Sequence, residues 1–219
     1  MAVKPKLLVV EGLNDRHAIL HLLRESGVLP KDADAISSPL EIKDVRSKKN
    51  VIEDIRTRKE HGRTHIGYVI DADDMDDDPP GCQPTWQSAC HQLTQIGVTA
   101  PSKPPADGFA GQFDAMGRRI GVWIMPDNAQ NAELEEFLFS MLDRDDPLYR
   151  FAETSTILAP NHGARFPASK RAKAQLAALL AWQEKPALTY GQAMQAGLFD
   201  PNSPLAVRFC DWIRRLFEL

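Results

Sequence analysis

The sequence predicts an α/β fold in which helices flank a mostly parallel sheet. Three apolar segments, residues 6–10, 66–70 and 120–125, have the unbroken hydrophobic character of strands that are covered on both faces. Stretches with apolar residues at helical spacing lie between these segments, and such an alternation of strand and helix is typical of a parallel sheet. The residues after the last strand are helical in pattern and form a C-terminal helical extension.

The chain opens with a strand, a tight turn and a helix. Residues 6–10 form the expected strand, and Glu11 and Gly12 form the turn. The helix is expected to begin near residues 14–15 and to end at Gly27, because glycine tolerates the left-handed conformation that closes many helices. The first part of the chain is thus predicted to be a β-turn-α unit.

The later elements follow from the same patterns. Helices are expected over residues 50–61 and 85–96, with Gly97 at the end of the second. Residues 100–117 are expected to form a loop with a short hairpin around Gly111. The remaining helices are expected at residues 133–142 and 170–184, near Gln192, and at residues 204–217, where Ser203 is suited to cap the helix.

Composition and charge narrow the class of protein. The 219 residues are 43% apolar and 26% charged, which is the balance of a soluble globule, and no apolar run approaches the roughly 20 residues of a membrane span. A cytoplasmic protein without a membrane partner is therefore expected. The net charge of −4 excludes a surface that is basic all over, so a nucleic acid would need a local basic patch. The three cysteines form no CxxC pair, which supports neither a zinc site nor a disulfide framework.

Carboxylates follow all three predicted strands. Glu11 follows the first strand, Asp71 and Asp73 the second, and Asp127 the third. Because ligands of parallel α/β sheets bind beyond the carboxyl ends of the strands, these side chains are expected to converge. Clustered carboxylates repel one another unless a cation lies among them, and oxygen ligands without His or Cys favour Mg²⁺ or Mn²⁺.

Two explanations compete for these acids. For any one of them, a helix cap or a solvated loop residue is as good an explanation as a metal ligand. Acids at three strand ends together favour a site. Asp71 and Asp73 also fall on the same side of an extended chain, which lets both face one ion.

Two of these segments resemble a known metal-binding module. VEGLNDRHAI and YVIDADD resemble the Toprim domain of topoisomerases, primases, recombination-repair proteins and OLD-type nucleases, which has a Glu-Gly after its first strand and an Asp-x-Asp after a later one. The segments GVWIMPDN, LEEFL, RAKAQLAALLAWQEKP and GLFDPNSPLAVRFCDWIRRLF are similar to a small family of stand-alone prokaryotic Toprim-like proteins. This resemblance covers nearly the whole chain and implies a Toprim-like domain over residues 1–146, with a helical extension over residues 147–219 packed on it.

The resemblance assigns roles to individual residues. Glu11 matches the Toprim glutamate, which is a metal ligand or general acid/base, and Asp15 matches the second acid of the EGxxD form of OLD-type nucleases. Asp71 and Asp73 match the Asp-x-Asp metal pair. In the third region, Asp127, Asn128 and Glu135 match polar positions of the stand-alone family, and Lys173 matches a lysine of the following helix. The implied metal ligands are Glu11, Asp15, Asp71, Asp73, Asp127 and Glu135, and the implied catalytic residues are Glu11 and Lys173.

The resemblance implies a Mg²⁺- or Mn²⁺-dependent nuclease that hydrolyses nucleic-acid phosphodiesters. Two ions about 4 Å apart would activate a water and stabilise the leaving oxygen, and Lys173 would offset charge on the phosphorane. DNA is favoured over RNA as the nucleic acid, and phage defence or DNA repair would fit such an activity. Haloacid-dehalogenase phosphatases and response-regulator receivers are disfavoured because the first strand ends in Glu-Gly rather than in their paired acids.

A non-catalytic role is the alternative. The chain could be a Toprim-like subunit or sensor that binds metal or nucleotide and needs a partner. Many OLD-type nucleases carry an ATPase domain, and this sequence has no GxxxxGK[ST] loop, so an ATPase would have to act in trans. Assembly into a homo-oligomer is left open.

Two groups of basic residues are candidates for nucleic-acid binding. One lies between the first two motifs and the other in an acid-free stretch near the predicted helix at 170–184. The residues assigned to binding are Arg46, Lys48, Lys49, Arg165, Lys170 and Arg171. Such runs are more often solvated helix faces, by about two to one, and the balance reverses if they flank the metal site.

Overall fold

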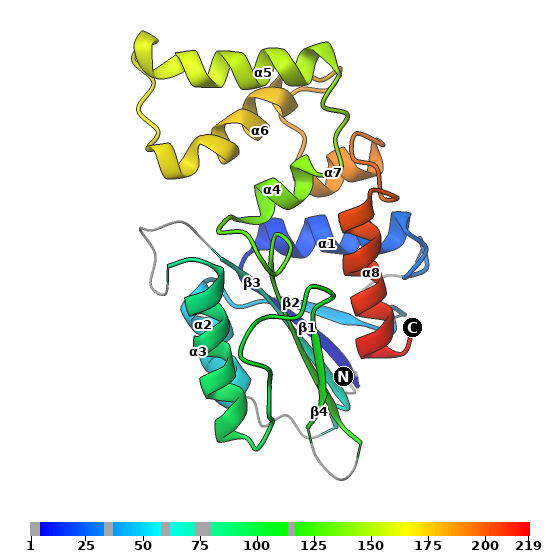
Figure 1. The fold of residues 1–219 in the computed structure, drawn as a ribbon. Helices are drawn as coiled ribbons and strands as arrows, with labels where there is room; N and C mark the ends of the chain where they lie inside the picture. Colours follow the sequence, from blue (N-terminus) through cyan, green and yellow to red (C-terminus); the bar gives the residue numbers. More distant parts are fainter. Residues whose placement is uncertain (1–4, 33–36, 58–61, 73–79, 114–116) are drawn as a thin grey trace.

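A computed structural model describes residues 5–32, 37–57, 62–72, 80–113 and 117–219, and within these ranges five strands form one sheet (Figure 1). The strand order is β2-β1-β3-β5-β4. Four strands are parallel and β4 runs antiparallel to β5 at one edge. The strands are β1 Lys6–Val10, β2 Glu41–Asp44, β3 His65–Asp71, β4 Phe109–Gln112 and β5 Arg119–Met125.

Helices cover both faces of this sheet (Figure 1). The pair α2 (Lys48–Thr57) and α3 (Cys82–Gln95) covers one face, and α1 (Leu13–Glu25) and α8 (Pro204–Phe217) cover the other. Successive residues of a strand point to opposite faces, so each buried strand contributes to two separate cores. This two-sided burial explains why the strands have unbroken apolar sequences.

Two glycines let α8 approach the sheet closely. A Cβ atom on Gly67 would lie 2.9 Å from the side chains of Leu216 and Phe217, and one on Gly121 would lie 2.5 Å from Leu216. Any larger residue at these strand positions would therefore push α8 outward. The helix begins as the sequence predicts, because the Ser203 hydroxyl accepts a hydrogen bond from the Ala206 N–H and Pro204 occupies the first turn.

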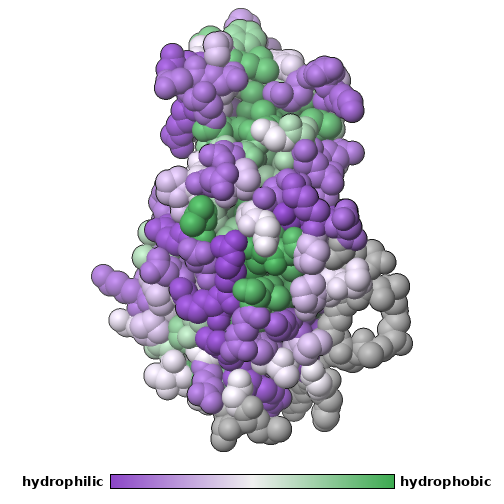
Figure 2. All heavy atoms as spheres, turned by 90° about the vertical axis from the view of Figure 1, so that its right-hand side faces the viewer, coloured by the Kyte–Doolittle hydropathy of each residue, from purple (hydrophilic) through white to green (hydrophobic). Residues whose placement is uncertain are grey.

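The remaining helices lie beyond the carboxyl ends of the parallel strands (Figure 1). Helices α4 (Leu134–Phe139) and α7 (Tyr190–Gln195) lie near α1, and the antiparallel pair α5 (Pro147–Leu158) and α6 (Arg171–Ala181) lies farther from the sheet. Two short 3₁₀ turns, Ala159–His162 and Ala168–Lys170, connect the pair. Figure 2 shows hydrophilic side chains over much of one face, with apolar groups exposed in the upper, helical part.

The predicted α/β fold with a mostly parallel sheet and C-terminal helices is confirmed. The three expected strands correspond to β1, β3 and β5, and the expected hairpin around Gly111 contains β4. The sequence analysis missed β2 and α5. Strand β2 has four residues of which only Ile42 is a buried apolar one, so it carries little pattern.

Helix α5 was missed for a different reason. It contains Thr, Ser and Ile residues of modest helix propensity. Its start signal was nevertheless present, since the Asp146 carboxylate caps the N–H groups of Leu148 and Tyr149, and Pro147 stands in the first turn. No helix in the described ranges is long and apolar enough to cross a bilayer.

Candidate acidic site at the carboxyl end of the sheet

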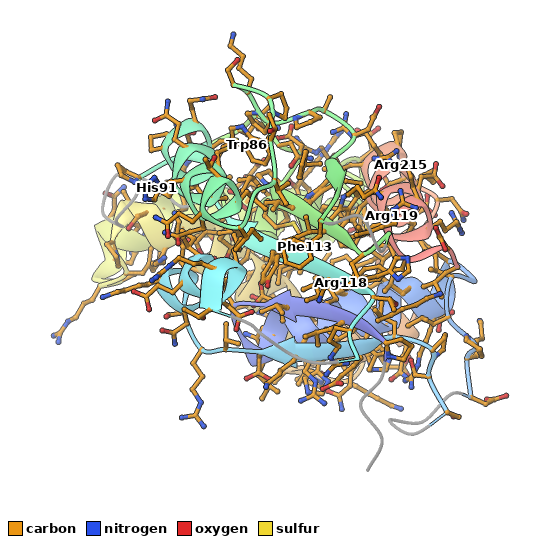
Figure 3. All side chains as sticks on the ribbon, turned by 90° about the horizontal axis from the view of Figure 1, so that it is seen from below. Trp86, His91, Phe113, Arg118, Arg119 and Arg215 are labelled. Atoms are coloured by element: carbon orange, nitrogen blue, oxygen red, sulfur yellow. The ribbon has the colours of Figure 1, made fainter. Side chains whose placement is uncertain are left out.

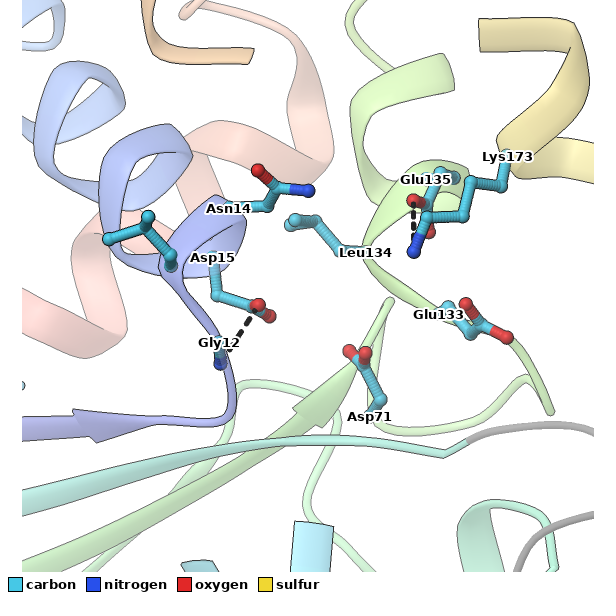
Figure 4. A pocket seen from close by; sticks show the side chains of 9 residues that line it. Gly12, Asn14, Asp15, Asp71, Glu133, Leu134, Glu135 and Lys173 are labelled. Atoms are coloured by element: carbon cyan, nitrogen blue, oxygen red, sulfur yellow. Dashed lines mark hydrogen bonds and ion pairs between the residues drawn. The ribbon is translucent and has the colours of Figure 1, made fainter. Parts of the chain in front are cut away.

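A cavity of about 260 Å³ opens where β1 and β3 end and α4 begins (Figure 4). Its wall is predominantly polar and carries four carboxylates and one ammonium group. The lining residues are Gly12, Leu13, Asn14, Asp15, Asp71, Glu133, Leu134, Glu135 and Lys173. Segments far apart in the sequence thus bring Asp15, Asp71, Glu135 and Lys173 together, and all four are residues to which the resemblance assigns a role.

Asp15 lies in the first turn of α1. Its Oδ2 accepts a hydrogen bond from the Gly12 N–H at 3.2 Å, which fixes the carboxylate over the turn after β1. The side chain is buried, with 8% of the residue exposed. Burial raises the pKa of Asp15 to about 6, and the nearby Glu135 carboxylate adds to the rise. Ionisation of the Asp15 carboxyl group is therefore less favourable in the folded protein than in water.

Glu11 connects the ends of two strands. Its Oε1 accepts a hydrogen bond from the Asp71 N–H at 2.8 Å, so the carboxylate holds the end of β3 against the turn after β1. The Asp71 carboxylate itself lines the cavity, whereas Glu11 is not one of the lining residues in the described ranges. Asp73 lies outside the described residues.

Glu135 is the most deeply buried acid of the cavity, with 3% of the residue exposed. The Tyr190 hydroxyl donates a hydrogen bond to Glu135 Oε1 at 2.8 Å, and the Lys173 Nζ lies 4.0 Å from the same oxygen. Burial and the neighbouring Glu135 carboxylate raise the pKa of Tyr190, which keeps its hydroxyl protonated as a donor. Glu133, two residues earlier and also on the cavity wall, accepts a hydrogen bond from Lys170 Nζ at 2.5 Å.

The side chain of Asp127 binds the backbone of the turn that follows β5. Its carboxylate accepts hydrogen bonds from the Ala129 N–H at 3.0 Å and from the Gln130 N–H at 2.8 Å, which closes the turn after β5. Partial burial opposes ionisation of Asp127, but these hydrogen bonds outweigh it and lower the pKa. The neighbouring Asn128 is buried and accepts a hydrogen bond from the Ile124 N–H at 2.7 Å. Among the described cavity residues, neither Asp127 nor Asn128 occurs.

The basic residues between the first two motifs fall into two environments. Arg46 and Lys49 are exposed, and Lys49 lies 3.9 Å from the Glu53 carboxylate one turn along α2. Lys48 is buried, with 6% of the residue exposed, and its Nζ donates to the Ala72 carbonyl oxygen at 3.0 Å. The ammonium group of Lys48 thus points into the protein, toward the peptide that separates Asp71 from Asp73.

The second basic group lies nearer the cavity. Arg165 and Arg171 are exposed, Lys170 pairs with Glu133, and Lys173 reaches the cavity wall from α6. These side chains come from the segment that ends in the 3₁₀ turn Ala168–Lys170 and from the start of α6. Of this group, Lys170 and Lys173 lie at the acidic cavity, and basic residues beside a metal site favour a phosphate-binding role.

The donor set of the cavity suits a hard divalent cation. All four acidic side chains offer oxygen, and among the described residues of the wall there is no histidine or cysteine. In the described ranges no three such side chains are already arranged around one point as a preformed metal site. The pKa of Asp15 is raised mainly by burial and to a lesser extent by the Glu135 carboxylate, and a cation bound beside Asp15 would favour its charged form.

Two residues of the site were not predicted from the sequence. Glu133 precedes the recognised Glu135 by two positions, and its place at the start of α4 is a signal that could have found it. Tyr190 lies 55 residues beyond Glu135 and carries no motif. Only the packing of α7 beside the cavity reveals it.

Comparisons with known proteins give a family and a fold. The model of a family described as "Protein of unknown function (DUF3226)" matches residues 5–218. No curated protein matched the sequence. The C-terminal region of the Burkholderia pseudomallei OLD protein is a similar solved structure, with 15% sequence identity, a TM-score of 0.50, and coverage of 99% of this chain and 100% of that one. At this identity the likeness shows the fold alone.

Proposed function

Since the chain belongs to the family described as protein of unknown function (DUF3226), and since its fold resembles that of the C-terminal region of an OLD protein, we propose that it is a Toprim-type nuclease. The reaction is hydrolysis of nucleic-acid phosphodiesters with Mg²⁺ or Mn²⁺. One observation carries this proposal: the cavity at the carboxyl ends of the parallel strands combines Asp15, Asp71 and Glu135 with the ammonium group of Lys173.

The cation would be held by the oxygens of Asp15, Asp71 and Glu135, with Asp73 as a further ligand from the adjacent segment. Bound there, the ion would supply Lewis-acid polarisation of a phosphodiester and an activated water. The residues of the chain contribute the rest. Glu11 holds the backbone of Asp71 in place through its hydrogen bond, and Lys173 offsets negative charge on the reacting phosphate.

The ionisation of Asp15 links cation binding to pH. With a pKa of about 6, this carboxyl group holds a proton in mildly acidic solution and is charged above that pH. A cation and this proton compete for the same oxygens. Cation binding should therefore strengthen as the pH rises through 6.

The polyanion would be held by the basic residues that flank the cavity. Arg165, Lys170 and Arg171 precede Lys173 in the chain, and their segment lies beside the acidic wall. Phosphate contacts of this kind position a strand without reading its sequence. DNA is the preferred substrate of the proposal. From the same resemblance to OLD-type proteins, the proposal includes an ATPase that acts in trans and a role in phage defence or DNA repair.

A cleavage assay tests the function. Plasmid, single-stranded DNA and structured RNA are incubated with Mg²⁺ or Mn²⁺ and with wild type, Asp71→Asn or Glu135→Gln, and Glu53→Gln on the exposed side of α2 serves as the matched control. We expect both site variants to lose more than about 100-fold in rate while the control retains its activity. Cleavage that persists in both site variants would exclude this cavity as the active site.

A second outcome distinguishes the alternative function. Wild type that binds Mn²⁺ in calorimetry but cuts none of the three nucleic acids, with binding lost in Asp71→Asn, would indicate a metal-binding subunit or sensor. Addition of candidate ATPase partners would then be the next measurement.

A further inference from the structure

Tyr190 connects a late helix of the chain to the acidic cavity. It is the first residue of α7, and its hydroxyl donates a 2.8 Å hydrogen bond to Oε1 of the buried Glu135. Tyr190 is itself buried, with 9% of the residue exposed. The bond therefore lies in an environment where water does not compete, and it compensates part of the cost of burying the carboxylate.

Helix α7 has a capped N-terminus and packs against α1, and both features position the Tyr190 ring. At its N-terminus, Gln192 N donates to Thr189 Oγ1 at 3.3 Å and Thr189 N donates to Gln192 Oε1 at 2.9 Å, which forms a capping box. A Cβ atom on Gly191 would lie 2.5 Å from the His21 ring, so α7 lies directly against α1. The same helix α1 carries Asp15 in its first turn, so one packed pair of helices positions both Asp15 and Tyr190, the hydrogen-bond donor to Glu135.

The two partners of Glu135 occupy the same oxygen. Tyr190 and Lys173 both approach Oε1, and in the described ranges Oε2 receives no hydrogen bond. We propose that Tyr190 is a positioning residue that fixes the Glu135 carboxylate through Oε1 so that Oε2 is presented to a divalent cation in the cavity. This inference rests on the proposed metal-dependent function.

The chemistry of a phenol suits this task better than that of a cation. A hydroxyl donor stabilises the charged carboxylate without adding positive charge that would repel the metal ion. Lys173 cannot fix the carboxylate in the same way, because 54% of its side chain is exposed and its distance of 4.0 Å is that of a loose ion pair. Glu135 thus has a neutral partner at hydrogen-bond distance and a charged partner that is farther away and half exposed.

The test is the affinity for Mn²⁺ of Tyr190→Phe, measured by calorimetry on the full chain at a temperature where all variants are folded. Tyr149→Phe is the matched control, because Tyr149 is also buried, while in the described ranges the hydroxyl that bonds to Glu135 is that of Tyr190. We expect Tyr190→Phe to weaken binding about tenfold, the usual size of a lost hydrogen bond to a metal ligand, and Tyr149→Phe to leave it unchanged. A change that appears equally in both variants would overturn the assignment, because it would show a general effect of removing a buried hydroxyl.

A double variant tests whether Tyr190 acts through Glu135. In the Glu135→Gln background, Tyr190→Phe should cause no further loss of Mn²⁺ affinity, and an additive tenfold loss would overturn the proposal. Wild-type affinity in Tyr190→Phe would overturn the positioning role while leaving the metal site intact. Absence of any Mn²⁺ binding by wild type would overturn the metal site and this role together, so the two failures are distinguishable.

Discussion

The two ends of the parallel sheet treat their charged residues in opposite ways. At the amino end, Glu218 lies 2.9 Å from Arg119 and 3.7 Å from His65, and Arg63 forms a 2.8 Å ion pair with Glu41. Figure 3 views this end from below and labels Arg119, and the Arg118 guanidinium lies over the Phe113 ring, 4.7 Å from its centre. At the carboxyl end, the cavity wall has four acids and one lysine. Acids are matched by cations at one end and outnumber them at the other.

The pKa values record this difference. Hydrogen bonding to Arg119 and the nearby His65 lower the pKa of Glu218, whereas burial and Glu135 raise the pKa of Asp15. A carboxyl group whose pKa is lowered on folding stabilises the fold when it is charged, and one whose pKa is raised by burial opposes folding when it is charged. Ion pairs at the amino end of the sheet therefore stabilise the fold, whereas the acids at the carboxyl end are suited to bind a cation.

The largest expected effect comes from replacing Lys173, the lysine among the described residues that line the acidic cavity. Lys173→Met should lower kcat about 100-fold, because the reacting phosphate loses a positive group, while KM changes less. Lys185→Met, at an exposed position after α6, is the matched control and should retain full activity. Steady-state cleavage assays give both constants. Equal activity of Lys173→Met and wild type would show that this lysine does not act on the reacting phosphate.

The next prediction compares substitutions of two adjacent lysines, Lys48 and Lys49. Lys48 donates to the Ala72 carbonyl, and the Ala72 N–H donates to the Ala132 carbonyl at 3.2 Å, so Lys48 helps to fix the peptide beside Asp71. Lys48→Met should destabilise the protein by about 2 kcal/mol, whereas Lys49→Met should change the free energy of unfolding by less than about 0.5 kcal/mol. Urea denaturation measures both. Similar values for the two variants would remove the structural distinction between the lysines.

The contrast between these lysines also shows where sequence reasoning stops. The strands β1, β3 and β5 could be predicted because burial on both faces requires unbroken apolar segments. Lys48 and Lys49 have the same side chain and neighbouring positions, so only the turn of α2 distinguishes the buried lysine from the exposed one. A charge cluster in a sequence therefore does not say which of its members reach solvent.

The acidic site shows the same limit. Asp15 and Glu135 could be proposed only through the resemblance to a known family, whereas the rule that ligands bind at strand ends pointed to Asp71 but also to Asp127, which does not line the cavity in the described ranges. Tyr190 has no such mark, because its role depends on how α7 packs against α1. Sequence patterns predict which acids lie at strand ends, but the partners that orient those acids are decided by tertiary packing.

A smaller effect is expected from neutralising Asp15, the buried acid of the cavity whose pKa is raised. Asp15→Asn keeps an oxygen that can accept the Gly12 N–H bond but removes the buried charge. Because the pKa is raised on folding, the folded wild type retains its proton while the unfolded chain loses it, and stability falls as the pH rises from about 4 to about 6. The variant should thus be more stable than wild type by roughly 1–2 kcal/mol above pH 6 and equal to it near pH 4. Urea denaturation across this pH range in the absence of divalent cations is the measurement, and a variant that is less stable at pH 8 would contradict it.

The smallest effect is expected at the amino end, and its sign is opposite. Glu218 has a lowered pKa, so its charged form stabilises the fold, and this contribution is present above the ordinary carboxyl pKa and is lost as the pH falls. Glu218→Gln should therefore be slightly less stable than wild type at pH 7 and equal to it in acid, with a difference that shrinks at high salt because the pair with Arg119 is exposed. Its affinity for Mn²⁺ should be unchanged. A stabilised Glu218→Gln at pH 7 would mean that both ends of the sheet carry excess negative charge, and the acidic cavity would then lose its distinction as the end that needs a cation.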